Sequence, residues 1–567
     1  MSPSPASTLP WSRPSRRLLL ELELTRGLTE APPSTPLQAA RARHVPVLRH
    51  VVEGLRLAAD DPEVAGLVVH VGLQQPSLAE SGELRAAISG LRAAGKATVC
   101  WAESYGEMAA GNVGYHLASM CEEVWLQPSG DLGLTGVVAE AVFVRDALDK
   151  LGVEPQIGQR EEYKTAADAV VRSRMSAAHR EMAERLVASA TDTIVEDVAA
   201  ARGLTPQQVR DAIAHAPLPA ADAVARGLVD RTGYRDEVYA DLRRRLGAVQ
   251  LRYVDRYRRH RLRRPVAVVR RRGRPAVAVI HAVGPIHLGR GGGRTPLSGP
   301  SVGSDTLGAA LRASGRDADV RAVVLRVNSP GGSYLASDAI RREVLRLRET
   351  GRPVVASMGT VAASGGYYIA MPADVVVASA GTLTGSIGVL AGKQVLRDAL
   401  GRLGVRRESV SQDRYAEMFS SQRRFSEEEW QRVEGWLDRI YDDFTAKAAH
   451  DRGLALEDLR RVAKGRVWTG ADARRHGLVD RLGGLEDAID VACQRAGVAR
   501  SEVAVRTVPR RTLLDRVRPA ESSERPAAAA VAEMTELSLA SLLPQALAAL
   551  GMPVYGVLMT PVTWRLI

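Results

Sequence analysis

The sequence predicts an α/β fold that is built twice in tandem. Two separated blocks repeat with a nearly constant offset: Arg145–Val153 match Arg397–Val405, and Gly227–Arg231 match Gly477–Arg481. Agreement over two such blocks indicates a duplicated domain of roughly 200 residues, which is a usual domain size. The period is far too long for a solenoid of short repeats.

Both copies show the same order of expected elements. A run rich in β-branched residues leads to a loop and a helix-like stretch, and a second apolar run, a turn of small residues and another helix follow. Near-continuous apolar strands that alternate with helices are typical of parallel sheets covered on both faces. The expected ranges, first copy before second, are 64–71 and 320–327, 84–94 and 336–348, and 97–101 and 353–357.

The chain of 567 residues is too long for one hydrophobic core, so two domains with tails are expected. An arginine-dense segment separates the two copies. The predicted boundaries are 1–20 for an N-terminal tail, 21–250 for the first copy, 251–275 for a basic linker, 276–508 for the second copy and 509–567 for a partly disordered C-terminal extension.

The composition, 45% hydrophobic and 25% charged, is that of a folded protein. Three cysteines without a pairing pattern argue against a disulfide scaffold or a cysteine metal site. The net charge of +12 is concentrated in the stretch 252–274, which suits a solvated linker, anionic lipid or nucleic acid. No nucleic-acid motif accompanies it, so we expect no nucleic-acid partner. Neither a metal nor an organic cofactor is expected, because no HExxH, P-loop or dinucleotide motif occurs.

Targeting signals are weak at both ends. The apolar stretch after Arg17 is cut short by Glu21 and Glu23, so no cleavable signal peptide is expected. The segment Leu537–Thr563 is apolar but is interrupted by three prolines, whereas a spanning helix needs about 20 apolar residues. A helix lying on a membrane or a partner is the preferred interpretation of this segment. The expected location is therefore membrane-associated or cytoplasmic, on a side of the membrane that stays open.

The two copies differ where chemistry is expected. The second copy carries the loop Asn328–Ser333, with Gly331 and Gly332 paired, whereas the first copy has Gly72–Pro76 without paired glycines. Adjacent glycines let backbone N–H groups converge on an anion, as an oxyanion hole requires.

A hydroxyl and an amine are distributed between the copies in a complementary way. Ser364 lies among small residues at a turn into a helix, and Asn112 occupies its place in the first copy. Lys164 lies in the first copy, and Ala416 stands at the matching position of the second. One Ser–Lys site shared by the two halves explains this pattern. Only six lysines occur among 77 basic residues, and lysine, unlike arginine, can lose its proton.

These features resemble the long, duplicated form of signal peptide peptidase A (protease IV). The resemblance spans about residues 40–490 and is carried by Asn328–Ser333, Ala362–Tyr367, Thr382–Gly388 and Tyr163–Lys164. It implies a crotonase-like (ClpP-like) fold in each copy and a bowl-shaped homotetramer on the membrane that degrades cleaved signal peptides. The family's usual N-terminal anchor is not evident, and the extension from about residue 509 has no counterpart in the family.

The resemblance also assigns roles to residues. Ser364 is expected to act as the nucleophile and Lys164 as the general base, with Ser386 hydrogen-bonded to the lysine amine. Backbone N–H groups of Gly331, Gly332 or Gly365 would bind the oxyanion. Lys393 is the rival base, since it lies only 29 residues after Ser364.

Two alternatives to a peptidase remain at this stage. The same fold hosts acyl-CoA hydratases and isomerases, although these generally use carboxylates that neither glycine segment offers. The other alternative is an inactive, membrane-associated scaffold, which the survival of both dyad residues disfavours.

Overall fold

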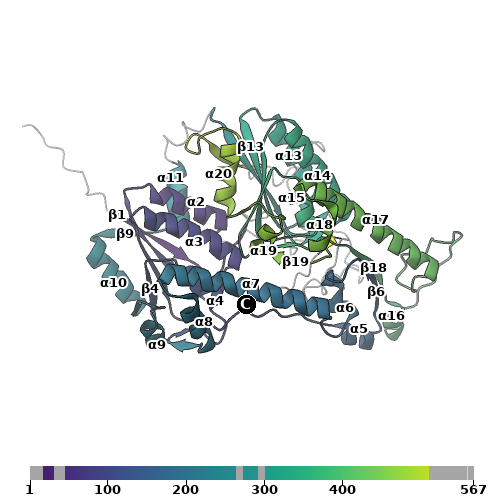
Figure 1. The fold of residues 1–567 in the computed structure, drawn as a ribbon, viewed down its shortest axis with the longest axis horizontal. Helices are drawn as coiled ribbons and strands as arrows, with labels where there is room; N and C mark the ends of the chain where they lie inside the picture. Colours follow the sequence, from purple (N-terminus) through teal and green to yellow (C-terminus); the bar gives the residue numbers. More distant parts are fainter. Residues whose placement is uncertain (1–16, 31–44, 264–272, 292–299, 510–557, 560–567) are drawn as a thin grey trace, which may run out of the picture.

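The computed structural model describes residues 17–30, 45–263, 273–291, 300–509 and 558–559. Each copy forms a sheet with a parallel core (Figure 1), and six strands of the second sheet repeat the order of the first. The first sheet runs β8-β4-β3-β2-β1-β9, and the second contains the path β20-β16-β15-β13-β10-β21. All neighbours along both paths are parallel. The predicted α/β class and the duplication are confirmed.

The strands of the first sheet are β1 (Arg17–Glu23), β2 (Val64–His70), β3 (Ala97–Ala102), β4 (Glu123–Leu126), β8 (Arg231–Thr232) and β9 (Val249–Tyr253). Their counterparts are β10 (Ala276–Val283), β13 (Val320–Ser329), β15 (Val354–Ala363), β16 (Val375–Ala378), β20 (Arg481–Leu482) and β21 (Ala504–Val508). The remaining strands are β5 (Asp131–Leu132), β6 (Glu154–Gln159), β7 (Leu218–Pro219), β11 (Ile286–His287), β12 (Val302–Gly303), β14 (Gly331–Gly332), β17 (Leu383–Gly385), β18 (Leu390–Val395), β19 (Val467–Thr469) and β22 (Leu558–Met559).

Helices cover both faces of each sheet. In the first copy they are α2 (Leu48–Ala59), α3 (Leu78–Ala93), α4 (Asn112–Ala118), α5 (Arg145–Leu151), the 3-10 turn η1 (Thr165–Ala167), α6 (Asp168–Val171), α7 (Ala177–Arg202), α8 (Pro206–Ala214), α9 (Ala220–Ala225), α10 (Arg235–Leu246) and α11 (Val254–Arg263). In the second copy they are α13 (Ser304–Arg316), α14 (Tyr334–Glu349), α15 (Gly365–Ala370), α16 (Arg397–Arg402), α17 (Glu427–Arg452), α18 (Leu456–Val462), α19 (Gly470–Arg475) and α20 (Leu485–Arg495).

One buried hydrogen bond recurs at matching places and fixes the alignment of the copies. The hydroxyl of Tyr115 in α4 donates to Leu228 O at 2.6 Å, and that of Tyr367 in α15 donates to Leu478 O at 3.2 Å. Because both tyrosines are fully buried, their hydroxyls need such partners. Helices α4 and α15 are therefore equivalent.

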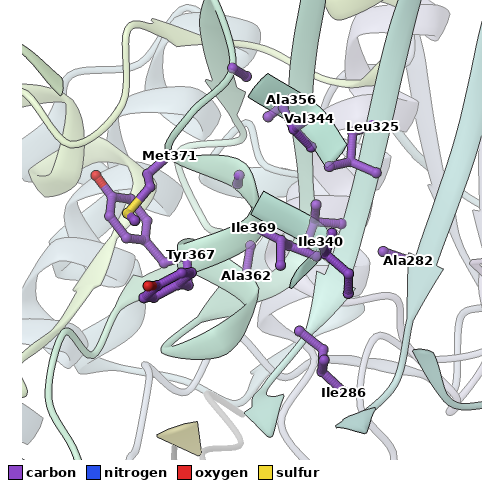
Figure 2. Packing of buried hydrophobic residues seen from close by; sticks show 14 of the residues in the cluster. Ala282, Ile286, Leu325, Ile340, Val344, Ala356, Ala362, Tyr367, Ile369 and Met371 are labelled. Atoms are coloured by element: carbon purple, nitrogen blue, oxygen red, sulfur yellow. The ribbon is translucent and has the colours of Figure 1, made fainter. Parts of the chain in front are cut away.

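Helix α15 is embedded in the core of the second copy. Tyr367, Ile369 and Met371 belong to one buried cluster with Ile340 of α14 and Leu325 of β13, and Figure 2 shows Ile369 beside Ile340. Close packing on all sides holds a short helix that has little stability of its own. The residue that precedes the helix is thereby held in place.

The two copies contact each other through a strand pair and a buried ion cluster. Strands β6 and β18 pair antiparallel across the copies. Arg326 of β13 is buried, and its guanidinium binds Glu30 at 2.6 Å and Glu83 of α3 at 2.6 Å. Ser357 Oγ accepts a further hydrogen bond from Arg326 at 3.0 Å. These ion pairs and hydrogen bonds offset the free-energy cost of removing the Arg326 guanidinium from water.

The segment expected as a basic linker is structured in its first half. Strand β9 pairs with β1, and α11 follows it directly. Tyr257 of α11 is buried, and its hydroxyl donates to Asp61 Oδ2 at 2.7 Å. The first copy therefore extends to Arg263. Among the described residues, no helix combines the length and apolar character needed to cross a membrane, and nearly all of Leu537–Thr563 lies outside them.

Candidate active site

Ser364 occupies the sharp turn from β15 into α15. Its backbone has φ 56° and ψ −115°, a conformation that non-glycine residues rarely adopt. Its N–H donates to Gly385 O at 2.8 Å, which ties the turn to β17. A Cβ on the neighbouring Gly366 would lie 2.4 Å from Ser329 O, so the tight turn requires glycine there. Strain of about 1–3 kcal/mol at such a residue is often found at functional sites.

The amine of Lys164 lies between two serines of the other copy. Lys164 Nζ is 2.8 Å from Ser364 Oγ, 3.0 Å from Ser386 Oγ and 3.1 Å from Ser386 O. Ser386, like Ser364, has a positive φ, of 52°. The residues predicted to form the dyad, and the serine predicted to support the lysine, thus lie within hydrogen-bond distance of one another.

Lys164 is completely buried, although Glu161 and Glu162 just before it are exposed. Desolvation by burial holds the pKa of the Lys164 amine well below its ordinary value of 10.5, and no charged partner counteracts this effect. Burial disfavours the charged form of an amine. Burial therefore shifts the equilibrium of the Lys164 amine toward its neutral form.

Two glycines of the second copy make room for the lysine. A Cβ on Gly465 would lie 2.6 Å from Lys164 N, and a Cβ on Gly388 would lie 3.2 Å from Lys164 Cδ. Gly465 also has φ +75° and donates its N–H to Ile387 O at 2.8 Å. The second copy thus covers the lysine with backbone, which excludes water without adding charge.

The segment Lys464–Arg466 holds the lysine loop against the second copy. Tyr163 N donates to Lys464 O at 3.2 Å, and Ser386 N donates to Arg466 O at 2.7 Å. The Arg466 guanidinium binds Glu181 of α7 at 2.8 Å, and Tyr163 donates its hydroxyl to the same carboxylate at 2.5 Å. Arg466 also lies over the Tyr163 ring, 4.7 Å from its centroid. This segment therefore links the residues that precede Lys164 to Ser386.

The expected oxyanion glycines lie beside the start of α15. A Cβ on Gly365 would be 3.1 Å from both Gly331 Cα and Gly332 N, so these backbones are in close contact. Gly331 N donates to Ser329 Oγ at 3.2 Å. As the first residue of a helix, Gly365 has no acceptor for its N–H within that helix. Gly365 is thus better placed than Gly331 to donate to a ligand.

The residues equivalent to Ser364 and Lys164 in the opposite copy form no second site of this kind. Asn112 exchanges two hydrogen bonds with Gly136, at 2.8 and 3.0 Å, and so fixes a loop of the first copy. Ala416 is exposed. The rival base Lys393 donates to Met418 O at 2.7 Å and lies over the Phe425 ring. Its amine is therefore engaged elsewhere.

Gly465 and Arg466 were not among the residues expected at the site. The sequence does contain a sign of their role, because the two copies differ at residues 464–466 as they do at Ser364 and Lys164. The first copy reads Ala214-His215-Ala216 where the second reads Lys464-Gly465-Arg466. Comparing the copies along their whole length would have singled out this segment.

Comparisons with known proteins agree with this architecture. The family model "Peptidase family S49" matches residues 91–249 and 346–499, one range in each copy. "Serine protease SPPA, chloroplastic" from Arabidopsis thaliana is 33% identical over 455 residues, which cover 80% of this chain and 66% of that protein. "Protease 4" from Salmonella typhi is 33% identical over 469 residues, which cover 79% of this chain and 71% of that protein.

A mutant of ClpP1 from Listeria monocytogenes is among the solved structures that match, with 12% identity, coverage of 37% of this chain and 94% of its own, and a TM-score of 0.24. The family model covers more than half of this chain, and the bacterial relative is matched over more than two thirds of its length. Family membership favours a peptidase over the acyl-CoA and scaffold alternatives. The chain therefore belongs to peptidase family S49, as a serine peptidase of the long, duplicated signal peptide peptidase A type.

Proposed function

We propose that the chain is an endopeptidase that cleaves signal peptides already released from their proteins, or similar apolar peptides, with Ser364 as nucleophile and Lys164 as general base. The observation that carries this proposal is the 2.8 Å contact between a fully buried amine and the hydroxyl of a strained serine. A nucleophile within hydrogen-bond reach of a base that a third group orients is the signature of covalent catalysis.

The hydrogen bonds around Lys164 suit a neutral amine. Such an amine has two N–H groups and one lone pair. Ser386 O and Ser386 Oγ accept the two N–H groups, at 3.1 and 3.0 Å, which leaves the lone pair for the Ser364 hydroxyl. Ser386 therefore orients the base.

In the first half-reaction Lys164 Nζ takes the proton of Ser364 Oγ as the oxygen attacks the peptide carbonyl carbon. The oxyanion of the tetrahedral intermediate accepts hydrogen bonds from the N–H groups of Gly332 and Gly365, with Gly331 supporting their loop. The intermediate collapses as the C–N bond breaks, and the leaving amine takes the proton from Lys164. In the second half-reaction water gives a proton to Lys164 as its oxygen attacks the acyl carbon. The bond from the acyl carbon to Ser364 Oγ then breaks, Lys164 returns the proton to Oγ, and the acid product leaves.

Apolar peptides suit the surroundings of the glycine loop. Leu288 directly follows β11, and Leu335 lies in the first turn of α14, just after Gly332 and Ser333. These residues are 56% and 61% exposed, so apolar side chains are available to a peptide near the glycine loop. The proposal includes the membrane association and the homotetramer that the resemblance implies. Vesicle flotation tests the membrane association, and light scattering tests the oligomeric state.

The proposal is tested with purified wild type, Ser364→Ala, Lys164→Ala and Lys393→Met on a fluorogenic apolar peptide. A fluorophosphonate and intact-mass spectrometry report the covalent adduct. We expect Lys164→Ala to lose about 10²–10⁴-fold in kcat/KM, as is typical for removal of a general base. Ser364→Ala should lose both turnover and labelling.

Lys393→Met is the matched control, since it removes a different half-buried lysine, and it should keep wild-type turnover. Near-normal turnover of Lys164→Ala would reject that lysine as the base. If the wild type neither cleaved apolar peptides nor formed the adduct, the proposed chemistry would be wrong.

A further inference from the structure

A buried ion pair that the proposed mechanism does not use follows the general base closely in the chain. Asp168 is the fourth residue after Lys164, and its Oδ2 lies 3.1 Å from His179 Nδ1. Only 1% of Asp168 and 3% of His179 is exposed. Since a carboxylate can only accept hydrogen bonds, the imidazole Nδ1–H donates to it. A buried ion pair is weak evidence of a net gain in stability, so its place beside the base indicates a role in the site.

The backbone that joins Lys164 to this pair forms only short elements. The 3-10 turn η1 (Thr165–Ala167) follows the lysine directly, and α6 (Asp168–Val171) has four residues. Single turns of this kind have little stability of their own. The position of Lys164 therefore depends on how its loop is attached to larger elements.

Helix α7 is the larger element that the pair reaches, since His179 lies in its first turn. Figure 1 shows α7 running between α4 at one end and α6 at the other. Further along α7, Met182 Sδ accepts a hydrogen bond of 3.2 Å from Val467 N of β19, a strand of the second copy. The pair thus links the loop of the base to a helix that is fixed against the copy carrying Ser364.

The two copies differ at this attachment, as they do at the dyad. Helices α7 and α17 have the same length and begin at equivalent N-caps, Ser176 and Ser426, so His179 is equivalent to Glu429. Glu429 binds Arg423, which precedes the helix, at 2.6 Å. In the second copy the carboxylate is therefore on the helix, whereas in the first copy it is on the loop. The copy that carries the lysine has an attachment of its own.

We infer that the Asp168–His179 pair is a positioning device for the general base: it holds the loop of Lys164 on α7 and thereby places Nζ against Ser364 Oγ. The inference rests on the proposed function and adds two residues to it. Asp168 and His179 act through the position of Lys164, so they are positioning residues rather than catalytic ones.

The effect of Asp168 on the base comes from position rather than from charge. Burial accounts for the lowered pKa of the Lys164 amine, and among the residues that the structure describes no charged side chain adds to it. The carboxylate is also paired on both oxygens, because Asp168 Oδ1 lies 3.3 Å from Arg172 Nε. Loss of the pair should therefore change where the lysine lies and how well it is covered.

The test compares His179→Leu with His179→Asn in the full-length protein. Leucine removes the donor to Asp168, whereas the asparagine amide can offer an N–H near the position of Nδ1. We expect His179→Leu to lower kcat about ten- to 10²-fold with KM changed by less than about twofold, as misplacement of a catalytic group does. His179→Asn should recover most of this loss. The ascending limb of the pH profile of kcat should move to higher pH in His179→Leu, because a loosened loop admits water to the Lys164 amine.

Asp197→Asn is the matched control, because it removes a second His–Asp pair of α7. His116 Nε2 lies 2.8 Å from Asp197 Oδ2 and ties the other end of this helix to α4. This variant should keep wild-type kcat and the wild-type pH profile. Equal kcat in His179→Leu and wild type would overturn the inference, and so would equal losses in His179→Leu and Asp197→Asn. If His179→Leu did not fold, Asp168→Asn, which keeps the shape of the side chain, would replace it in the comparison.

Hydrogen exchange separates this inference from the proposed function, because it needs no turnover. On the Ser364→Ala background, amides of the peptide that spans residues 161–168 should exchange faster with His179→Leu than with Asp197→Asn. Faster exchange would support the inference even if the wild type cleaved no peptide. Equal exchange would reject it even if the peptidase assignment held.

Discussion

Lys164 Nζ lies 2.8 Å from Ser364 Oγ, although 200 residues separate the two in the chain. The lysine comes from the first copy of the duplicated fold and the serine from the second. The contact therefore depends on how the two copies pack against each other.

The pH dependence of kcat/KM should show an ascending limb whose apparent pKa lies well below 10.5. Burial lowers the pKa of Lys164, and the proposed mechanism needs that amine neutral, so activity should be lost as pH falls through the lowered value. Initial rates between pH 5 and 10 measure it. If the ascending limb had the ordinary pKa of a lysine, the Lys164 amine would be in contact with water.

The stability of wild type relative to Lys164→Met should increase with pH. Between the lowered pKa of the folded state and the ordinary value of 10.5, the unfolded chain binds a proton that the folded chain lacks. The free energy of unfolding therefore rises with pH in this window and is reduced as pH falls. The slope reaches at most about 1.4 kcal/mol per pH unit. Urea denaturation of both proteins at several pH values measures the difference. If the free energies of unfolding of the two proteins changed with pH in parallel, the prediction would be wrong.

Gly465→Ala should reduce kcat at least about tenfold, because its Cβ would lie 2.6 Å from Lys164 N and would displace the base. Gly453→Ala is the matched control. Gly453 also has a positive φ, of +63°, but a Cβ there would meet no atom within 4 Å. Both variants should lose about 1–2 kcal/mol from backbone strain. If both kept wild-type kcat, Gly465 would have no role in placing the lysine.

Arg466→Ala should lower kcat with little change in KM, since Arg466 fixes the lysine loop through Glu181 and Tyr163. Arg461→Ala, which removes an exposed arginine that pairs with Asp458 of the same helix, is the control and should keep wild-type kcat. A double-mutant cycle of Arg466→Ala with Glu181→Gln should show coupling in kcat. Additive effects would indicate that the two side chains act separately.

Arg326→Ala should destabilise the fold by about 3–5 kcal/mol, because it leaves the buried carboxylates of Glu30 and Glu83 unpaired. Arg342→Ala removes an exposed arginine whose partner Glu349 is exposed as well, and it should change stability by less than about 0.5 kcal/mol. Chemical denaturation measures the free energy of unfolding of both variants. A loss for Arg326→Ala no larger than that of the control would show that water reaches the cluster.

Much of the fold could be predicted from the sequence, because the same order of strands and helices is expected in both copies. The same comparison pointed to Ser364 and Lys164, where one copy has what the other lacks. Burial of Lys164 could not be predicted locally, since its neighbours Glu161 and Glu162 are exposed and its cover comes from Gly388 and Gly465 of the other copy.

Helix α11 was missed for a different reason. Its arginine-rich composition obscured the apolar residues Val254 and Tyr257, which recur at helical spacing and are buried against the first copy. The pairing of β22 with β14 joins segments more than 200 residues apart, and no local pattern predicts such a contact.

Division of the site between the copies has a consequence for biosynthesis. A ribosome makes Lys164 first, then Ser364, and Gly465 and Arg466 only afterwards. Domains generally fold as they emerge, the N-terminal one first. On the proposed chemistry, the nascent chain therefore carries no competent peptidase while the first copy folds alone. On that chemistry, cleavage becomes possible only after both copies have been made and have packed together.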